Sequence, residues 1–242
     1  MGFVKSKVDL SVIMPVYNEE GVIANSIVKT LEVLDSANLS YELVVVDDGS
    51  QDNTVKVLEH FKDRAIILTY KENKGKGYAL RYGASQAHGD TIAFFDSDLN
   101  IDPTHILVYF SYLQVNDVDA LIGSKRLKGS EVKTSFERRL LSLIYHLFVK
   151  ALLGLELMDS QVGIKMFKKT VLDQILPALT INRFAFDVEI LAIASRLKQK
   201  IVELPVSIHT SVAYSSVSLR AIEEMFIDTF KIAYKLRIAK GP

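Results

Sequence analysis

Short apolar runs alternate with amphipathic segments along the first half of the chain. Residues 8–17 (VDLSVIMPVY) are apolar at almost every position, as expected of a strand that is buried on both faces. Apolar residues then recur three and four positions apart, as at Ile23, Ile27 and Leu31, which predicts a helix over residues 18–37. The same two patterns predict further strands that begin at residues 41, 65, 90, 119 and 200, and helices over residues 55–63, 76–89, 104–117, 184–198 and 218–240.

Alternating strands and helices predict an α/β fold, in which helices cover both faces of a mainly parallel sheet. The pattern changes after residue 127, where a long amphipathic helix precedes a strand or hairpin at residues 163–167. No repeat, low-complexity tract or linker divides the chain. We therefore expect one α/β domain over residues 1–210 and a C-terminal amphipathic helix over residues 211–242.

The composition excludes several classes of function. The chain has 242 residues, of which 49% are hydrophobic, and this is enough for a sizeable core. Its formal net charge is zero, which argues against a nucleic-acid-binding protein that relies on bulk electrostatics. The chain has no cysteine, so disulfides and cysteine-ligated metals are excluded.

Polar residues follow three of the predicted strands, in the segments PVYNEE (residues 15–20), VDDGS (46–50) and DSD (96–98). Ligands of parallel sheets bind at the carboxyl ends of strands, so these side chains are expected to converge on one edge. Asp96 and Asp98 are spaced so that both carboxylates can reach one hard divalent cation, Mg²⁺ or Mn²⁺. Such an ion would neutralise a diphosphate leaving group. A solvated turn is the alternative interpretation of an isolated D-x-D sequence.

Two further polar segments have an ordinary structural interpretation beside a functional one. Asp47 and Asp48 fit a turn or helix-cap cluster, but an Asp at this strand end can also accept hydrogen bonds from a base or a ribose hydroxyl. Gly75 and Gly77 flank Lys76, but the rest of a Walker phosphate loop is missing, so this segment on its own favours a surface turn.

Taken together, these motifs resemble the inverting nucleotide-sugar glycosyltransferases of family two, which have a GT-A fold. The resemblance is carried by VIMPVYNEE, VVVDDGSQDNT, NKGKGYALRYGASQAHGD and IAFFDSDLNIDP, in that order, and covers residues 8–210. It implies that Pro15, Tyr17 and Glu19 line the nucleotide base and ribose. The other donor-binding residues that it implies are Val46, Asp48, Lys76, Asp96, Ser97 and Asp98, and the implied metal ligands are Asp96, Asp98 and Asn100.

The second half of the chain resembles the polyprenyl-phosphate sugar synthases, which make dolichyl-phosphate mannose or dolichyl-phosphate glucose. The matching segments are IGSKR, ERRLLS, DSQVGIKMF, FAFDVEILAIA and VELPVSI, and the fourth is more similar to the glucose-transferring branch. Ser97 departs from the D-A-D sequence of both branches, a difference that bears on the sugar. The resemblance thus implies a GDP- or UDP-hexose donor and a polyprenyl (dolichyl) phosphate acceptor.

This acceptor would need cations more than a base, because a lipid phosphate is already anionic near neutral pH. The resemblance places Arg126, Arg138 and Ser142 at the positions that bind the acceptor phosphate, and an Arg fork suits phosphate oxygens. It also places Asp187 where many relatives have a catalytic base. For a hydroxyl acceptor Asp187 would deprotonate the nucleophile, whereas for a phosphate it would only orient another group. Without the resemblance, Arg138 fits a solvated helix face and Asp187 fits a helix N-terminal acid.

Two predicted helices carry apolar faces that fit either the core or a lipid surface. In the first, apolar residues recur along residues 140–152, beside Arg138, Arg139 and Lys150. The second, at the C-terminus, has an apolar face and a basic end. No uncharged apolar stretch reaches roughly 18 residues, so we expect no membrane span. We expect instead a cytoplasmic protein that binds peripherally to the cytoplasmic face of a membrane, or to a membrane partner subunit.

The sequence leaves three functions open. A metal-dependent hexosyltransferase that acts on a polyprenyl phosphate explains all of the motifs. An enzyme of the same family could instead use a sugar hydroxyl as acceptor, with Asp187 as the base. The third is a non-catalytic nucleotide-sugar-binding subunit, and the intact pair of Asp96 and Asp98, together with Arg126, argues against it.

Overall fold

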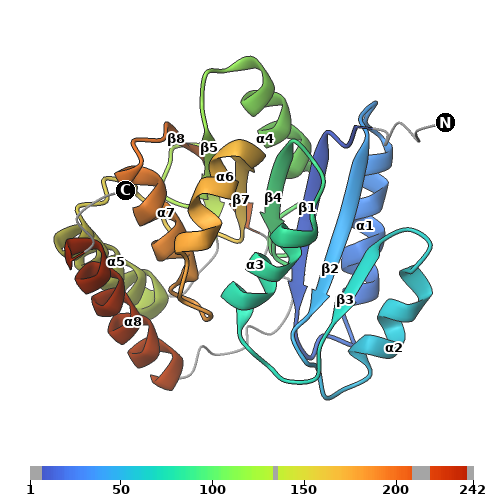
Figure 1. The fold of residues 1–242 in the computed structure, drawn as a ribbon, viewed down its shortest axis with the longest axis horizontal. Helices are drawn as coiled ribbons and strands as arrows, with labels where there is room; N and C mark the ends of the chain where they lie inside the picture. The colour runs from blue at the N-terminus through green and yellow to red at the C-terminus, as the bar shows by residue number, and fades with distance from the viewer. Residues whose placement is uncertain (1–6, 133–135, 209–218, 239–242) are drawn as a thin grey trace.

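A seven-stranded sheet with the order β3-β2-β1-β4-β7-β5-β8 forms the centre of the computed structural model, which describes residues 7–132, 136–208 and 219–238 (Figure 1). Its strands are β1 (Leu10–Val16), β2 (Tyr41–Asp47), β3 (Ile66–Thr69), β4 (Thr91–Phe95), β5 (Ala120–Ser124), β7 (Ile164–Lys168) and β8 (Ile201–Pro205). Neighbouring strands pair in parallel except at β7, which is antiparallel to both β4 and β5. The predicted strands and the mainly parallel sheet are confirmed.

Helices cover both faces of the sheet, as the alternation of elements predicted (Figure 1). The helices are α1 (Ile23–Asp35), α2 (Thr54–Leu58), α3 (Lys76–Gln86), α4 (Thr104–Val115), α5 (Phe136–Leu153), α6 (Lys169–Ile175), α7 (Phe186–Arg196) and α8 (Leu219–Ile238), with 3-10 turns η1 (Glu59–Phe61) and η2 (Leu176–Ala178). A small second sheet pairs β6 (Glu131–Val132) with β9 (Ser207–Ile208). The sequence analysis did not predict α6, because two turns of helix are too short for an apolar period to stand out.

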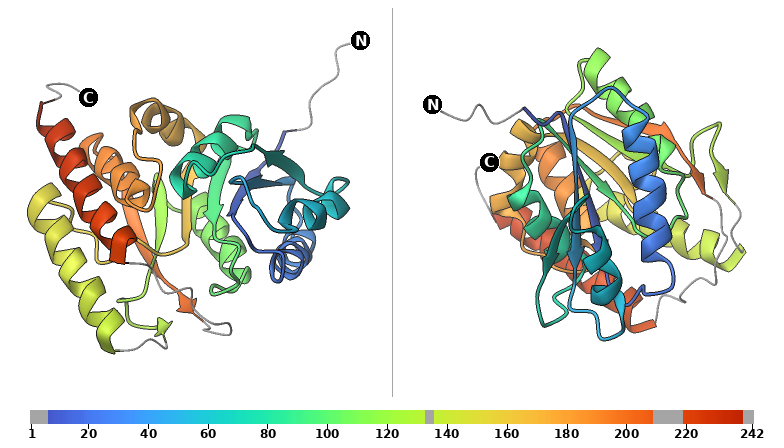
Figure 2. Two further views of the ribbon diagram at one scale, coloured as in Figure 1. Left: turned by 90° about the horizontal axis from the view of Figure 1, so that it is seen from below. Right: turned by 90° about the vertical axis from the view of Figure 1, so that its right-hand side faces the viewer.

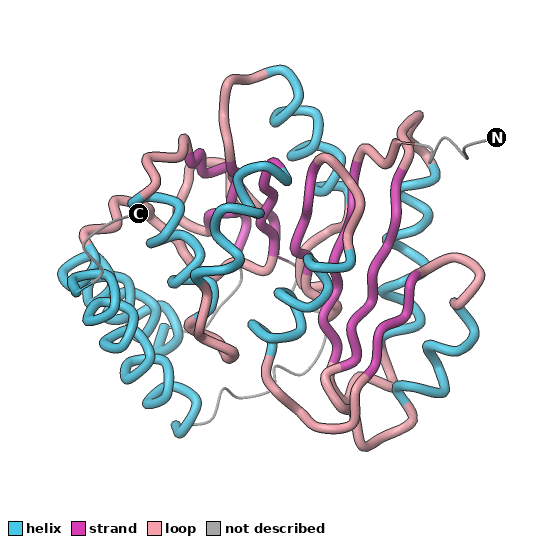
Figure 3. Tube along the Cα trace, viewed as in Figure 1, coloured by secondary structure: helices cyan, strands magenta, loops and turns pink. Residues whose placement is uncertain are grey.

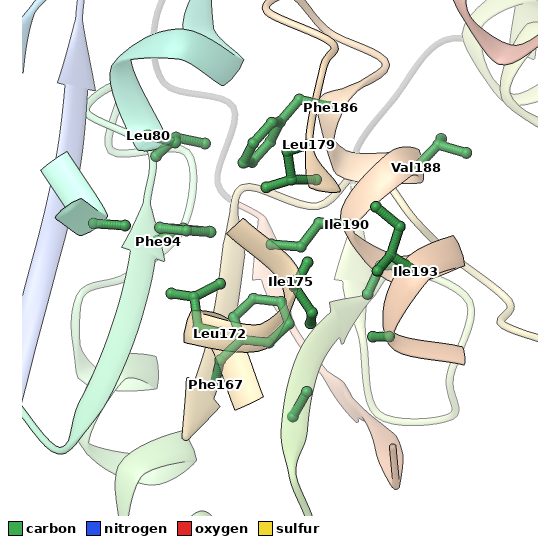
Figure 4. Packing of buried hydrophobic residues seen from close by; sticks show 14 of the residues in the cluster. Leu80, Phe94, Phe167, Leu172, Ile175, Leu179, Phe186, Val188, Ile190 and Ile193 are labelled. Carbon is green, nitrogen blue, oxygen red and sulfur yellow. The ribbon is translucent and has the colours of Figure 1, made fainter. Parts of the chain in front are cut away.

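Successive side chains of the central strands enter different layers, because the side chains of a strand alternate between its two faces. Phe94 and Phe167 point into the layer of α3, α6 and α7, where the ring of Phe94 lies 6.0 Å from that of Phe186 (Figure 4). Met14 and Phe95 point into the opposite layer, formed by α1, α2 and α4. All residues of β1 and β4 are buried on both faces of the sheet. This explains why the sequences of these strands are almost continuously apolar.

The long helices α5 and α8 lie side by side at one end of the molecule (Figure 2). The ring of Phe148 lies 4.8 Å from that of Phe226 and 5.1 Å from that of Phe230. The Tyr145 hydroxyl lies 2.9 Å from Thr229 Oγ1 and is buried with it. Within the described ranges, every helix is either too short or too polar to cross a membrane.

Candidate active site

The carboxyl ends of β1, β2 and β4 meet at one edge of the sheet (Figure 3). From β1 the sheet extends through β2 and β3 on one side, and the chain then returns to β4 on the other side. Ligands of open α/β sheets bind at the strand ends beside such a reversal. Tyr17 and Glu19 follow β1, Asp48 follows β2, and Asp96 follows β4. The structure therefore brings the three predicted polar segments together.

Three carboxyl groups, those of Glu19, Asp96 and Asp98, influence one another at this edge. Asp98 Oδ1 accepts a hydrogen bond of 3.0 Å from the Asn100 N–H, and Asp98 Oδ2 accepts one from the Asn100 amide. Burial raises the pKa of Asp98 above its usual range, and the charge of Asp96 raises it further. Burial also raises the pKa of Glu19 to about 7, with additional increases from Asp98 and Asp96. The three carboxyl groups thus concentrate negative charge at this edge, where Asp98 is exposed and Glu19 and Asp96 are half-buried.

The carboxyl group of Glu19 is only partly satisfied by the residues around it. The Glu19 N–H donates to Thr54 Oγ1 at 2.8 Å, which fixes the residue against the start of α2. Its Oε2 atom is buried and has no hydrogen-bond partner among the described residues. A buried oxygen without a partner costs free energy, so this position suits a ligand or a cation at the edge of the sheet.

The predicted metal ligands fit a hard divalent cation. Asp96, Asp98 and Asn100 offer carboxylate and amide oxygens, which are the donors that Mg²⁺ and Mn²⁺ prefer. In residues 7–132, 136–208 and 219–238, no three His, Cys, Asp or Glu side chains are grouped as a metal centre. Mg²⁺ usually takes one or two carboxylates and completes its coordination with water and substrate phosphates. A cation at this edge would therefore depend on a bound diphosphate.

Lys76, the first residue of α3, supplies a positive charge to this edge. Its Nζ lies 2.6 Å from Asp96 Oδ1 and 4.0 Å from Asp187 Oδ2. Burial by itself lowers the pKa of Lys76, but attraction to Asp96 and Asp187 outweighs burial and raises the pKa above its ordinary value. Lys76 is therefore a charged ammonium group beside the place where a diphosphate would need neutralising.

The glycine after Lys76 allows α3 to pack closely on the segment before α7. A Cβ atom added to Gly77 would lie 2.8 Å from Phe186 Cγ, which is too close for any side chain. The Tyr78 N–H donates to Asn182 O at 3.0 Å in the same contact. The helix predicted from residue 76 is confirmed, and the alternative of a surface turn, which the motif on its own favoured, does not hold because Gly77 is packed against Phe186.

The antiparallel strand β7 brings two further residues to the site, and the sequence analysis assigned neither of them. The Asp96 N–H donates to Gly163 O at 2.9 Å, and a Cβ atom added to Gly163 would lie 2.6 Å from Asp96 Cγ. Lys165 is buried, and its Nζ lies 2.9 Å from Asp187 Oδ1. The sequence signal for Lys165 was a lysine between apolar residues inside a short predicted strand.

Asp187, the predicted catalytic base, lies at the start of α7 between two ammonium groups. Its Oδ1 faces Lys165 and its Oδ2 faces Lys76, and the residue is 7% exposed. Each carboxylate oxygen keeps a further lone pair, but the short contact with Lys165 fixes the direction of the carboxylate. The role of Asp187 as a base stays a prediction, and the geometry favours an orienting role.

Asp48 holds the loop that leads into α3. Its carboxylate accepts hydrogen bonds from the Tyr70 hydroxyl at 2.7 Å, the Asn73 amide at 2.9 Å, and the N–H groups of Lys74 and Gly75, each at 2.8 Å. A carboxylate has about four lone-pair directions, so these bonds use most of its capacity. A contact between Asp48 and a nucleotide base stays a prediction. The base would have to share the Asp48 carboxylate with the four groups that already donate to it.

The other predicted donor-binding residues differ in exposure. Tyr17 is 41% exposed, which leaves its ring open to a ligand. The Ser97 hydroxyl is buried and donates to Pro15 O at 3.0 Å, so its hydrogen-bonding need is met inside the protein. The Val46 side chain lies in the core. Nucleotide contacts of Pro15, Val46 and Ser97 stay predictions, and the side chains of Val46 and Ser97 point into the protein.

Two of the predicted acceptor-phosphate residues lie together. Arg126, two residues beyond β5, places Nη2 3.0 Å from Ser142 O and 3.2 Å from Ser142 Oγ on α5. The backbone of Arg138 lies in α5, but its side chain is outside the described part of the structure. Burial lowers the pKa of His146, and the positive charges of Arg126 and Lys150 lower it further. Asp159 and Glu203 oppose this decrease, so charges of both signs lie near His146.

Comparison with known proteins identifies the family. Residues 11–176 match glycosyl transferase family 2, so the chain belongs to this family. The chain is 32% identical over 214 residues to a dolichyl-phosphate beta-glucosyltransferase from Dictyostelium discoideum, covering 82% of this chain and 65% of that protein. It is 33% identical over 215 residues to a protein of the same name from Drosophila melanogaster, covering 82% and 66%. The chain thus spans slightly less than two thirds of the length of these relatives.

A solved structure confirms the GT-A fold. The structure of glucosyl-3-phosphoglycerate synthase from Mycobacterium tuberculosis, in complex with Mn²⁺, UDP-glucose and phosphoglyceric acid, matches with a TM-score of 0.74. The match covers 94% of this chain and 80% of that chain at 20% sequence identity. At this identity the likeness defines the fold, and the family match and the fold together confirm the resemblance on which the sequence analysis relied.

The raised pKa of Glu19 predicts a specific loss of stability with increasing pH. Between its ordinary value of 4.5 and about 7, the folded protein keeps a proton on Glu19 that the unfolded chain has lost. The free energy of unfolding should therefore fall by up to about 3 kcal/mol as pH rises through this window. Glu19→Gln should remove this decrease in thermal melts at pH 5 and pH 8 without added metal. The exposed Glu32→Gln is the control, and an unchanged pH slope in Glu19→Gln would contradict the assignment.

Proposed function

We propose that the protein is a metal-dependent, inverting hexosyltransferase that moves a sugar from a nucleoside diphosphate sugar to a polyprenyl phosphate. Family membership supports the reaction class. The names of the relatives favour a glucosyl group and a dolichyl-type phosphate acceptor. The donor is a UDP- or GDP-hexose, and the divalent cation is Mg²⁺ or Mn²⁺.

One observation carries the proposal: Asp96, a proposed cation ligand, and Arg126, a proposed phosphate ligand, follow strands that end at the same edge of one sheet. Strands β4 and β5 are each antiparallel to β7, so they run in the same direction, and the residues that follow both strands meet at that edge. Asp96 follows β4 and Arg126 follows β5. Two strand spacings separate β4 from β5, roughly 10 Å. This separation suits a donor diphosphate and an acceptor phosphate on either side of a transferred sugar.

The residues of the chain then have distinct tasks. Asp96, Asp98 and Asn100 would hold the cation, which would supply positive charge to the diphosphate as it leaves. Lys76 adds a second positive charge beside Asp96. Arg126 would hold the acceptor phosphate, whose oxygen attacks the anomeric carbon while the bond from that carbon to the diphosphate breaks. This single in-line displacement inverts the anomeric centre.

The state of Asp187 favours a phosphate acceptor over a sugar hydroxyl. A hydroxyl must lose a proton during attack, which calls for a base near the nucleophile. Asp187 is 7% exposed and pairs with the buried Lys165 at 2.9 Å, an arrangement that suits an orienting role. A phosphate acceptor is already anionic, so its reaction needs no base. The proposal therefore ranks the polyprenyl phosphate above the hydroxyl acceptor.

The exposed apolar surface of α5 and α8 would place the active site at a membrane. This surface, called the apolar face, consists of Leu140, Leu141, Leu143, Ile144, Leu147, Ile227, Phe230, Tyr234 and Ile238, each at least 38% exposed. Arg126 donates to the oxygens of Ser142 and so lies against the same helix, α5. A lipid could thus place its phosphate at Arg126 and its chain along α5. Peripheral binding on the cytoplasmic face of a membrane is part of this proposal.

A transfer assay tests the proposed reaction. Purified protein, Mn²⁺ or Mg²⁺, UDP- and GDP-hexoses and a short polyprenyl phosphate should give a lipid-linked sugar, and a chelator should abolish it. Arg126→Ala should weaken use of the lipid phosphate by about ten- to a hundredfold, because it removes a charge-assisted contact worth roughly 1.5–3 kcal/mol. Affinity for the nucleotide sugar should change far less. Full transfer in excess chelator, or unchanged acceptor kinetics in Arg126→Ala, would count against the proposal.

Liposome flotation tests the apolar face. Ile144→Glu with Leu147→Glu places two charges on residues that are 49% and 54% exposed, so folding should survive. Binding to anionic liposomes should fall at least about tenfold, since each apolar side chain contributes roughly 1.5–3 kcal/mol when it leaves water. Val108→Glu is the matched control, because Val108 is 57% exposed on α4. Equal flotation of all three proteins, with unchanged melting temperatures, would show that the apolar face does not bind lipid.

A further inference from the structure

Lys165 is a buried lysine that the proposed reaction does not use directly. Its side chain is 3% exposed on β7, in the middle of the sheet. Its Nζ donates to Val162 O at 2.7 Å and lies 2.9 Å from Asp187 Oδ1. Burying an ammonium group is unfavourable unless it is paired and hydrogen-bonded, and apolar residues of similar size often stabilise a fold equally well. Stability alone therefore does not explain a lysine at this position.

Lys165 begins a row of alternating charges that ends at the proposed metal ligands. The row, called the charge ladder, consists of Lys165, Asp187, Lys76 and Asp96. Successive Nζ–Oδ distances along it are 2.9 Å, 4.0 Å and 2.6 Å. The ladder joins β7, α7, α3 and the end of β4. The long middle step shows that Asp187 is held closely by Lys165 and only loosely by Lys76.

The two lysines of the charge ladder differ in their freedom to move. Lys165 is enclosed, whereas the Lys76 side chain is 24% exposed at the edge of the sheet. A divalent cation at Asp96 would repel the Lys76 ammonium, which would then have to bind another anion. The nearby choices are Asp187 and the diphosphate of the donor.

We propose that Lys165 is a positioning residue that neutralises Asp187 and so leaves Lys76 free to bind the donor diphosphate. Without Lys165, Asp187 would have Lys76 as its nearest ammonium and would draw it away from the diphosphate. This inference rests on the proposed function, because it assumes a nucleoside diphosphate at the edge of the sheet. The inference gives Lys165, on β7, an influence on donor binding, although this residue lies outside the loops that follow β1, β2 and β4.

A structural role and a positioning role for Lys165 give different results. A residue that only supports the fold affects all ligands of the site alike. A residue that acts through Asp187 on Lys76 affects ligands with a diphosphate and spares those that lack the second phosphate. The ratio of affinities for nucleoside diphosphate and nucleoside monophosphate therefore separates the two roles.

The experiment measures this ratio by titration calorimetry with saturating Mn²⁺, using UDP and UMP, and GDP and GMP. Lys165→Met should lower the ratio about tenfold, the loss expected for one charge-assisted contact. The double variant Lys165→Met with Asp187→Asn should restore the affinity ratio to within about threefold of its value in the original protein. The Asn amide has no negative charge, so it attracts the Lys76 ammonium far less than the carboxylate does. Lys165→Arg should keep the ratio, since it keeps the charge. Lys168→Met is the matched control, because Lys168 lies on the same strand but pairs with Asp119 at 3.3 Å.

The outcomes distinguish this inference from the proposed function. If the original protein binds neither diphosphate more tightly than its monophosphate, the proposed donor site is wrong, and the inference falls with it. If the original protein shows the preference and folded Lys165→Met keeps it, only the inference is overturned. Failure of the double variant to recover also overturns it. Should Lys165→Met melt below the assay temperature, Lys165→Gln, which keeps an N–H donor without the charge, is expected to show the same loss.

Discussion

Repulsion among Glu19, Asp96 and Asp98 is the interaction on which the rest of the site depends. Neighbouring carboxylates raise one another's pKa unless positive charge lies among them. Lys76 supplies one such charge at 2.6 Å from Asp96, whereas burial, with repulsion as a further cause, raises the pKa of Glu19 and Asp98. A cation together with a diphosphate would complete the neutralisation. In the proposed function, the site would thus bind both at once.

The topology of the sheet creates this concentration of charge. Because β1, β2 and β4 are parallel, their polar extensions come to one edge, and no single loop would gather as many charged groups. The antiparallel β7 then brings residues from the second half of the chain to the same edge. Gly163 leaves room for the Asp96 carboxylate, and Lys165 adds a buried charge behind it. The proposed donor and acceptor sides would therefore share one sheet.

Much of this arrangement could be predicted from the sequence, because local patterns determine it. Continuous apolar runs indicated the buried strands, and the acids directly after them indicated the edge where Asp96 and Asp98 meet. The tasks of Gly77, Lys165 and Asp48 could not be predicted in this way. Each depends on a partner that is distant in the sequence, as Lys165 depends on Asp187. The local spacing of apolar and polar residues gives no information about such pairs. The exposed side of α5 was also ambiguous, because an amphipathic stripe fits both the core and lipid.

The most direct test of this account is the thermodynamic coupling between a divalent cation and a diphosphate. Mn²⁺ binding should be measured by titration with and without a saturating nucleoside diphosphate, UDP or GDP. The account predicts that the diphosphate raises Mn²⁺ affinity by at least about tenfold, with an equal effect of Mn²⁺ on the diphosphate, and that Asp98→Asn abolishes the coupling. Independent binding of the two ligands, or coupling that persists in Asp98→Asn, would contradict the claim that these carboxylates form a shared site.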